Sequence, residues 1–149
     1  MSNTKKNRNI IFTVFATVAV FLTVAAFAGC RTEEGDLQKG LSAARQQDYK
    51  TAAKYFTAAA EQGNAVAQLS LGSCYLYGAG VKKDEKQAVK WFRMSADQSY
   101  AIAQLVLGNC YYNGLGVKKN NAEAVKWYRK AAEQGNDLAI EALKRLGAE

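Results

Sequence analysis

Residues 63–135 repeat one pattern of hydrophobic, small and polar positions every 36 residues. Each copy opens with a stretch whose apolar side chains recur at helical spacing, as Ala67, Leu71 and Tyr75 do in the first copy. Two glycines separated by one residue then interrupt the pattern, and a second amphipathic stretch follows. A fixed period of this length is typical of stacked-repeat proteins. The sequence therefore predicts consecutive helix–turn–helix units.

The ends of these helices are predicted from residues that favour caps. Asn64 can cap the first helix of the first copy, and Gly78 can end it in a left-handed turn. Asp84 can cap the second helix, and Asn120 holds the same place 36 residues later. The second helices are expected to bury one stripe each, made of Ala88, Trp91, Phe92 and Ser95, and of Ala124, Trp127, Tyr128 and Ala131.

Neither helix pair can bury its apolar face alone, so stacking of neighbouring pairs is expected to form the core. In such a stack, a small alanine or glycine can seat a large aromatic side chain from the next helix. The predicted fold class is all-α, an α-α superhelix (solenoid) of about three helix–turn–helix units.

Residues 67–92, AQLSLGSCYLYGAGVKKDEKQAVKWF, and their counterpart 36 residues later resemble the Sel-one-like (Sel1-like) repeat, a relative of the tetratricopeptide repeat. The family pattern is close to A-x-x-x-L-G-x-x-Y-x-x-G-x-G-V-x-x-D-x-x-x-A-x-x-W-Y. The departures are mild, because Asn120 replaces the usual Asp and Ser99 replaces the Gly found at Gly63 and Gly135. The resemblance implies a concave face lined by first helices that binds a protein or peptide.

The segments on either side fit the same register. Residues 36–62 are expected to form a degenerate first unit, with Leu37, Gly40, Leu41 and Ala44 on the core stripe of its first helix. Residues 136–149 predict a C-terminal cap helix, with Leu138, Ala142, Leu143 and Leu146 inward and Glu141, Lys144 and Arg145 outward. The expected organisation is a signal peptide (1–29), a lipidated cysteine with a short tether (30–35), the first unit (36–62), two full repeats (63–98 and 99–135) and the cap helix (136–149).

The N-terminus has the layout of a secretory signal: basic residues at Lys5, Lys6 and Arg8, an apolar run over 10–28, and small residues before Cys30. It resembles a bacterial lipobox, which implies cleavage before Cys30 and a lipid such as palmitate on its sulfur. An uncleaved N-terminal membrane anchor is the alternative, since about 18 apolar residues can just span a bilayer. The expected location is the bacterial cell envelope, lipid-anchored and facing the periplasm, and resemblance to known sorting rules favours the outer membrane because Arg31 follows the cysteine.

Composition narrows the possible chemistry. The 149 residues include no histidine, and the formal charge of +7 comes partly from the basic N-terminus. No Ser–His or Cys–His pair is possible, so we predict no catalytic residue, cofactor or metal site. The lysines are scattered through the repeats, which favours a solvated surface over nucleic-acid binding. Cys74 and Cys110 are expected to be buried structural thiols, with a disulfide or redox role as the alternative.

The glycine pairs Gly78-x-Gly80 and Gly114-x-Gly116 precede predicted helices, as phosphate-binding loops do. No strand leads into them and no Lys-Ser or Lys-Thr follows, so the nucleotide-binding signature is incomplete. We interpret both pairs as turns.

The candidate functional surface is the stripe of each first helix that lies opposite the core. The two copies agree at core positions but differ on this stripe. Ser70 in the first copy is equivalent to Val106 in the second, and Tyr77 is equivalent to Asn113. We interpret the difference as a protein- or peptide-binding face, with ordinary surface drift as the alternative. The predicted residues are Val66, Leu69, Ser70, Ser73, Tyr77, Ile102, Leu105, Val106, Asn109 and Asn113.

Several functions fit this reading. The leading hypothesis is a membrane-anchored adaptor or scaffold that mediates protein–protein interaction in the bacterial envelope. One alternative is an immunity protein that neutralises a secreted toxic effector of the lipase type. A hydrolase-like enzyme that depends on Cys74 or Cys110, and a structural spacer with no binding face, are hypotheses of other classes.

Overall fold

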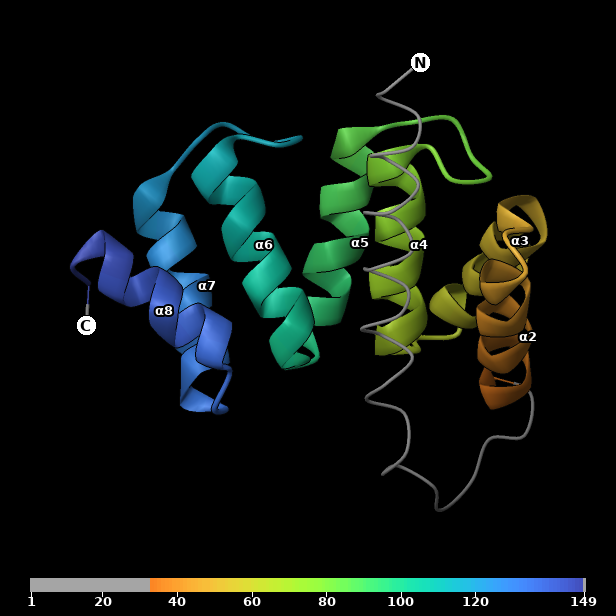
Figure 1. Ribbon diagram of the computed structural model, residues 1–149, viewed down its shortest axis with the longest axis horizontal. Helices are drawn as coiled ribbons and strands as arrows, with labels where there is room; N and C mark the ends of the chain where they lie inside the picture. The colour runs from red at the N-terminus through yellow and green to blue at the C-terminus, as the bar shows by residue number, and fades with distance from the viewer. Residues whose placement is uncertain (1–32, 149) are drawn as a thin grey trace. The chain divides into compact units, whose positions relative to one another are not determined.

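A computed structural model describes residues 33–148, so the expected signal peptide and Cys30 lie outside the described residues. Within this range the chain forms seven α-helices and no strand. They are α2 (Glu33–Arg45), α3 (Tyr49–Glu61), α4 (Ala65–Tyr77), α5 (Glu85–Asp97), α6 (Ala101–Asn113), α7 (Asn121–Glu133) and α8 (Asp137–Leu146) (Figure 1). The all-α prediction is confirmed. No helix among these residues is both long and apolar enough to cross a membrane.

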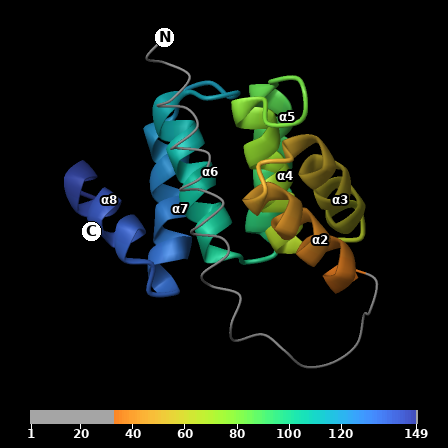
Figure 2. The same cartoon turned by 45° about the vertical axis from the view of Figure 1, so that its right-hand side comes forward.

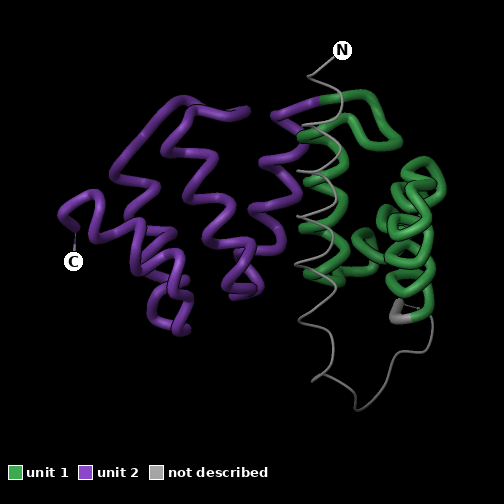
Figure 3. The backbone as a smooth tube through the Cα atoms, viewed as in Figure 1, with its two compact units in different colours: residues 1–83 green, residues 84–149 purple. Residues whose placement is uncertain are grey.

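The chain divides into two compact units, residues 1–83 and 84–149 (Figure 3). In the first unit, α3 packs against both α2 and α4. In the second unit, α6 packs between α5 and α7, and α8 packs on α7 (Figure 2). Within each unit, every helix thus contacts its neighbours in sequence, as expected for helix–turn–helix repeats.

The predicted caps are confirmed. The side chain of Asn64 accepts a hydrogen bond from the backbone nitrogen of Ala67 at 2.9 Å. Asp84 and Asn120 accept equivalent bonds at the starts of α5 and α7. Gly78 ends α4 in the left-handed conformation with φ 69°, as predicted. Helix α2 begins at Glu33, so the expected tether (30–35) includes residues that are helical.

The core shows the predicted seating of aromatic rings on small residues. A Cβ added to Gly40 in α2 would lie 2.7 Å from the Phe56 ring of α3. In α6, a Cβ on Gly108 would lie 2.5 Å from the Tyr128 ring of α7. Phe56 and Tyr128 hold the same repeat position and are buried. Of the two second-helix stripes predicted to be buried, only Trp91 is partly exposed.

The second glycine of each Gly-x-Gly pair has a role beyond the turn. A Cβ on Gly80 would lie 2.0 Å from the backbone oxygen of Tyr49, the first residue of α3. A Cβ on Gly116 would lie 2.1 Å from the backbone oxygen of Glu85, the first residue of α5. The loop of one repeat therefore rests directly on the start of the second helix of the preceding repeat. Only glycine leaves room for that approach.

Buried glutamines connect successive repeats within each unit. Gln68 donates from Nε2 to the backbone oxygen of Ala60 at 3.1 Å, and Gln104 donates in the same way to Ala96 at 3.3 Å. The Oε1 of Gln104 also accepts from Nε2 of Gln134 at 2.7 Å. These bonds satisfy carbonyls at the ends of α3 and α5, which explains how two polar side chains are buried.

Helix α8 differs from the prediction at one position. Leu138 is predicted to face inward, but its side chain is 62% exposed, whereas Ala139 and Leu143 are buried. The repeat register explains the difference, because Ala139 stands 36 residues after Ala103, which is also buried. The predicted outward residues Glu141, Lys144 and Arg145 are exposed. Helix α8 therefore keeps the register of α6, with Ala139 in the place of Ala103.

Ser99 carries a left-handed backbone that glycine would adopt without strain. Its φ is +63°, and Gly135 at the same repeat position has φ +80°, with open space where a Cβ would lie. An L-residue in this conformation costs about 1–2 kcal/mol. We expect Ser99→Gly to raise the free energy of unfolding by about 1 kcal/mol, because part of the relief is lost to greater freedom of the unfolded chain.

The matched control is the reverse change, Gly135→Ser, which should lower the free energy of unfolding by a similar amount. Urea titration followed by circular dichroism measures both. A Ser99→Gly variant no more stable than wild type would show that no strain resides at this turn.

Candidate functional site

The structure divides the predicted binding stripe into accessible and buried residues. Exposed or partly exposed are Val66, Tyr77, Ile102, Val106, Asn109 and Asn113, whereas Leu69, Ser70, Ser73 and Leu105 are buried. The expectation that the whole stripe faces solvent is therefore wrong at these four positions. The protein-binding role of the remaining residues stays a prediction.

Local hydrogen bonds explain why two serines can be buried. The Ser70 hydroxyl donates to the backbone oxygen of Val66 at 2.8 Å, and the Ser73 hydroxyl donates to that of Leu69 at 3.0 Å. Each bond runs back one turn along α4, so neither hydroxyl needs water or a partner protein. The sequence pattern places these polar residues at the surface because it does not account for such bonds.

An open pocket of about 340 Å³ lies in the second unit, on α6, α7 and α8. Two of the predicted residues, Asn109 and Asn113, line it. The other lining residues are not among the predicted site residues: Tyr112, Tyr128, Ala142, Arg145 and Leu146. Because α6 is a first helix, the pocket lies on part of the predicted binding stripe. It is the candidate functional site.

The unequal lengths of α6 and α8 account for the pocket. Helix α8 ends at Leu146, which corresponds to Cys110 in the repeat register. Helix α6 continues for another turn, to Asn113. Tyr112 and Asn113 therefore have no counterparts on α8, and the space beside them is left open. The internal repeat could have indicated this gap, since Gly147 stands where Tyr111 would be.

Hydrogen bonds hold the polar wall of the pocket. The Tyr128 hydroxyl donates to Oδ1 of Asn109 at 2.8 Å, and Nδ2 of Asn113 donates to the backbone oxygen of Asn109 at 2.9 Å. Because the Asn109 amide oxygen is already an acceptor, its Nδ2 group is left to donate. Burial raises the pKa of Tyr128, while the positive charge of Arg145 acts in the opposite direction. The hydroxyl therefore stays protonated at neutral pH and keeps Asn109 in place.

One cation, Arg145, lines the pocket, and a second, Lys119, lies beside the lining residue Tyr112. The Arg145 side chain is 73% exposed and pairs with Glu141 at 3.4 Å. Lys119 lies with Nζ 5.4 Å from the centre of the Tyr112 ring. An exposed pair such as Arg145–Glu141 is weak, so Arg145 can exchange it for another acceptor. The pocket thus offers hydrogen-bond donors and positive charge to a bound group.

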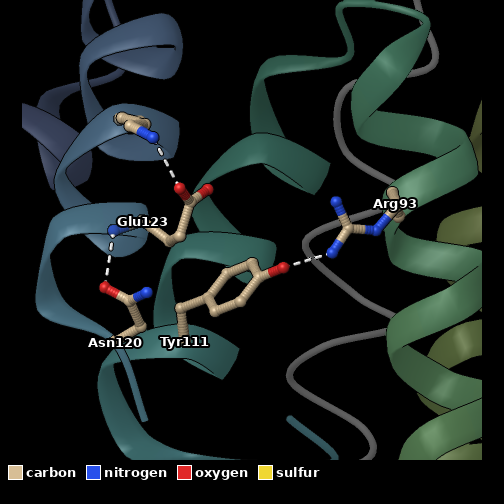
Figure 4. Close-up of polar contacts among 5 residues, drawn as sticks. Arg93, Tyr111, Asn120 and Glu123 are labelled. Atoms are coloured by element: carbon tan, nitrogen blue, oxygen red, sulfur yellow. Dashed lines mark hydrogen bonds and ion pairs between the residues drawn. The ribbon is translucent and has the colours of Figure 1, made fainter. Parts of the chain in front are cut away.

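A second polar cluster supports the end of α6. Arg93 of α5 donates a hydrogen bond to the hydroxyl of Tyr111, and the two side chains point toward each other (Figure 4). The backbone oxygen of Tyr111 accepts from the nitrogen of Asn120 at 2.8 Å, which fixes the loop before α7. On α7, Lys126 pairs with Glu123 at 2.6 Å. The bond between Asn120 and Tyr111 fixes the loop that carries Lys119 beside Tyr112. The exposed Lys126–Glu123 pair, in contrast, lies within α7 itself.

The thiols of Cys74 and Cys110 are free and buried. Burial raises the pKa of each thiol from 9.0 to about 12, and the negative charge of Glu85 adds to the effect at Cys110. A nucleophilic cysteine needs a lowered pKa and access to solvent. Neither thiol has the properties that the hydrolase hypothesis requires. Within residues 33–148, no group of three or more His, Cys, Asp or Glu side chains is placed to hold a metal ion.

We expect Cys74 and Cys110 to resist alkylation by iodoacetamide at pH 8 until the protein is unfolded. The thiolate that reacts is disfavoured in the folded state, because both pKa values are raised to about 12. For the same reason, the free energy of unfolding should fall as the pH rises above the unfolded value of 9.0. Mass spectrometry of native and urea-treated samples measures the labelling. Rapid labelling of either thiol in the native protein would contradict this.

Comparison with known proteins identifies three repeats in the chain. The family model described as "Sel1 repeat" matches residues 35–64, 65–100 and 101–136. No curated protein sequence matches the chain at a significant level.

Several solved structures are similar to this chain. A protective antigen with an SLR fold from uropathogenic Escherichia coli matches with a TM-score of 0.73 and 37% identity, over 74% of this chain and 25% of that one. A Sel1 repeat protein from Oxalobacter formigenes matches with a TM-score of 0.71 and 37% identity, over 74% of this chain and 45% of that one. The chain therefore spans a quarter of the first of these proteins and less than half of the second.

The cysteine-rich protein B of Helicobacter pylori is also similar, with a TM-score of 0.61 over 77% of this chain and 98% of that one. Its identity to this chain is 24%, so this likeness concerns the fold alone.

Proposed function

This chain belongs to the Sel1 repeat family, and from that premise we propose that it is a membrane-anchored adaptor of the bacterial envelope. Sel1 repeats generally mediate protein–protein interaction. The proposed adaptor binds another protein through its first helices. The pocket on α6, α7 and α8 is the observation that carries the proposal, because its donors are held in place and open to solvent.

The arrangement of the pocket suits a protein partner. Tyr112 is 39% exposed and combines a flat apolar ring with a hydroxyl, which is a combination common at binding hot spots. Around it stand amides and a guanidinium that can bond backbone or side-chain oxygens of a partner. The side chains of Tyr128, Asn109 and Asn113 are hydrogen-bonded before binding, so these three lose little further freedom on association.

Anchoring follows from the N-terminal sequence. We place a lipid on Cys30, which ends the apolar run, and the repeat domain outside the cytoplasm in the periplasm. Since α2 begins at Glu33, the chain between the lipidated residue and the first helix can extend no more than about 10 Å. Partners of this adaptor are therefore proteins at or near the same membrane surface.

We expect Cys30→Ser to abolish incorporation of radiolabelled palmitate and to leave the signal peptide uncleaved. Both effects follow because the cysteine sulfur carries the lipid, and lipid transfer precedes cleavage in the pathway that the sequence resembles. Intact-protein mass spectrometry of the membrane fraction reports both. A wild-type chain that retains residues 1–29 would instead support the uncleaved anchor.

Co-purification tests the binding function. The tagged full chain is extracted in mild detergent from cells that express it at natural levels, and bound proteins are identified. A defined partner should co-purify with wild type and be lost with Tyr112→Ala. The matched control is Lys126→Ala on α7, which removes an exposed side chain outside the pocket. Equal recovery of that partner with all three chains would contradict the proposal.

The identity of the partner separates two versions of this function. An envelope or secretion component bound alongside others indicates an adaptor. A secreted lipase-type effector, held in a tight one-to-one complex and inactive while bound, indicates an immunity protein instead. The pocket and its residues serve in both versions.

A further inference from the structure

We propose that the first-helix face of the second unit binds an extended protein segment in which an apolar side chain lies about three residues from an aspartate or glutamate. This face consists of Ile102, Val106 and Asn109 on α6, and Leu138, Ala142 and Arg145 on α8. The inference rests on the proposed protein-binding function and specifies the chemistry of the partner.

The apolar end of this face lies at the start of both helices. Leu138 is the second residue of α8 and is 62% exposed, the largest exposure among the exposed large hydrophobic side chains of residues 33–148. Ile102 holds the same position on α6 and is partly exposed. Covering this leucine with an apolar side chain of a partner would remove apolar area from water and so favour binding. The two side chains hold equivalent repeat positions and leave apolar surface exposed at the starts of α6 and α8.

The polar end lies two helical turns farther along the same helices. Asn109 follows Ile102 by seven residues, and Arg145 follows Leu138 by seven residues. Residues seven apart lie on the same helix face, at an axial separation of about 10 Å. Both polar residues line the pocket, where Asn109 has its oxygen bonded to Tyr128 and its amide nitrogen left to donate.

Small apolar residues connect the two ends. Val106 and Ala142 stand one turn after Ile102 and Leu138, and both are partly exposed. A separation of about 10 Å corresponds to one turn, about three residues, of an extended polyproline II segment, in which side chains three residues apart point to the same side. A segment lying along the helices would therefore place an apolar side chain at one end and, about three residues away, a second side chain in the pocket.

The charges at the pocket favour a carboxylate for that second side chain. Arg145 lines the pocket and is paired with the single carboxylate of Glu141. A second positive charge comes from Lys119, whose Nζ lies 5.4 Å from the ring centre of the lining residue Tyr112. Two of the carbonyls that end α6 are already occupied, since the oxygen of Cys110 accepts from the nitrogens of Gly114 and Leu115, and the oxygen of Tyr111 accepts from Asn120. A guanidinium with five donors can bond a partner carboxylate in a forked geometry that the 3.4 Å contact to Glu141 does not achieve.

A peptide selection tests this inference. The full chain in detergent micelles is used to pan a phage-displayed library of random dodecapeptides with neutral flanks. We expect enrichment of peptides with Asp or Glu about three residues from Leu, Ile, Val or Phe. For a synthetic peptide of the enriched sequence, Arg145→Gln should weaken binding about tenfold, as loss of a charged hydrogen bond does. Leu138→Ser should weaken it by a similar factor.

The matched control is Lys144→Gln, which removes the neighbouring exposed cation of α8, a residue that does not line the pocket. Its affinity for the peptide should equal that of wild type. A selection without acidic enrichment, or an affinity that falls equally in Arg145→Gln and Lys144→Gln, would overturn the inference. Those outcomes leave the binding function intact if a natural partner still co-purifies through Tyr112. Failure of co-purification would remove the function itself.

Discussion

Gly116→Ala is expected to lower the free energy of unfolding of the second unit by more than about 4 kcal/mol. That loss is a large part of the stability of a typical domain, so the second unit should be largely destabilised. The added Cβ would lie 2.1 Å from the backbone oxygen of Glu85 and 2.5 Å from its carbonyl carbon. A backbone group at the start of a helix cannot rotate away as a side chain can. The left-handed φ of +66° adds a further cost for alanine.

Gly114→Ala separates the two contributions. Gly114 has a similar φ of +73°, but a Cβ added there would have the Cβ of Lys119 as its nearest neighbour, at 3.3 Å. That variant should lose only about 1–2 kcal/mol, from the backbone conformation. Both tryptophans, Trp91 and Trp127, lie in the second unit, so their fluorescence during urea titration reports its unfolding. Equal losses in the two variants would show that the approach of Gly116 to Glu85 does not shape the fold.

Phe56→Ala is expected to cost about 3–5 kcal/mol in the first unit. Its ring has no solvent exposure and covers Gly40 of α2, where a Cβ would approach the ring to 2.7 Å. Because Gly40 has no side chain, α2 cannot fill the space that the ring leaves. The cavity should loosen the contact between α2 and α3, with partial loss of helical circular dichroism at urea concentrations that leave the tryptophan signal unchanged.

The adjacent Tyr55 provides the control. Its ring is partly exposed and lies 5.5 Å from Nζ of Lys39. Tyr55→Ala should cost no more than about 1–2 kcal/mol, since less apolar area leaves the core. If Tyr55→Ala destabilised the first unit as much as Phe56→Ala, the seating of Phe56 on Gly40 would not be the main contact between α2 and α3.

Features that depend on local chemistry or on the internal repeat can be predicted from the sequence. Asn64, Asp84 and Asn120 each bond a backbone nitrogen within three residues, so their capping role is visible in a short window. The left-handed turn at Ser99 follows from its alignment with Gly63 and Gly135. The seating of Tyr128 on Gly108 follows from the pairing of small and large residues across repeats.

Features that depend on neighbours in space are predicted less well. The sequence indicates only a turn at Gly80 and Gly116, because the helix start that each one contacts lies 31 residues away in sequence. Ser70 is predicted to be exposed because a hydroxyl group is polar. Its hydrogen bond to the backbone oxygen of Val66, which allows burial, is not evident from the sequence. Hydrophobicity places Leu138 inward, although the repeat register places Ala139 there. The pocket is formed by side chains from three helices, so the sequence pattern predicts only two of its lining residues, Asn109 and Asn113.

Photo-crosslinking in living cells tests most directly whether a partner protein binds at the pocket on α6, α7 and α8. Tyr112 is replaced by a photoreactive phenylalanine, which keeps an aromatic ring at an exposed lining position. The control places the same residue at Lys126, whose side chain is 66% exposed on α7. We expect one abundant crosslinked partner from position 112 and none from position 126. Equal crosslinking from both positions, or none from either, would contradict binding at the pocket.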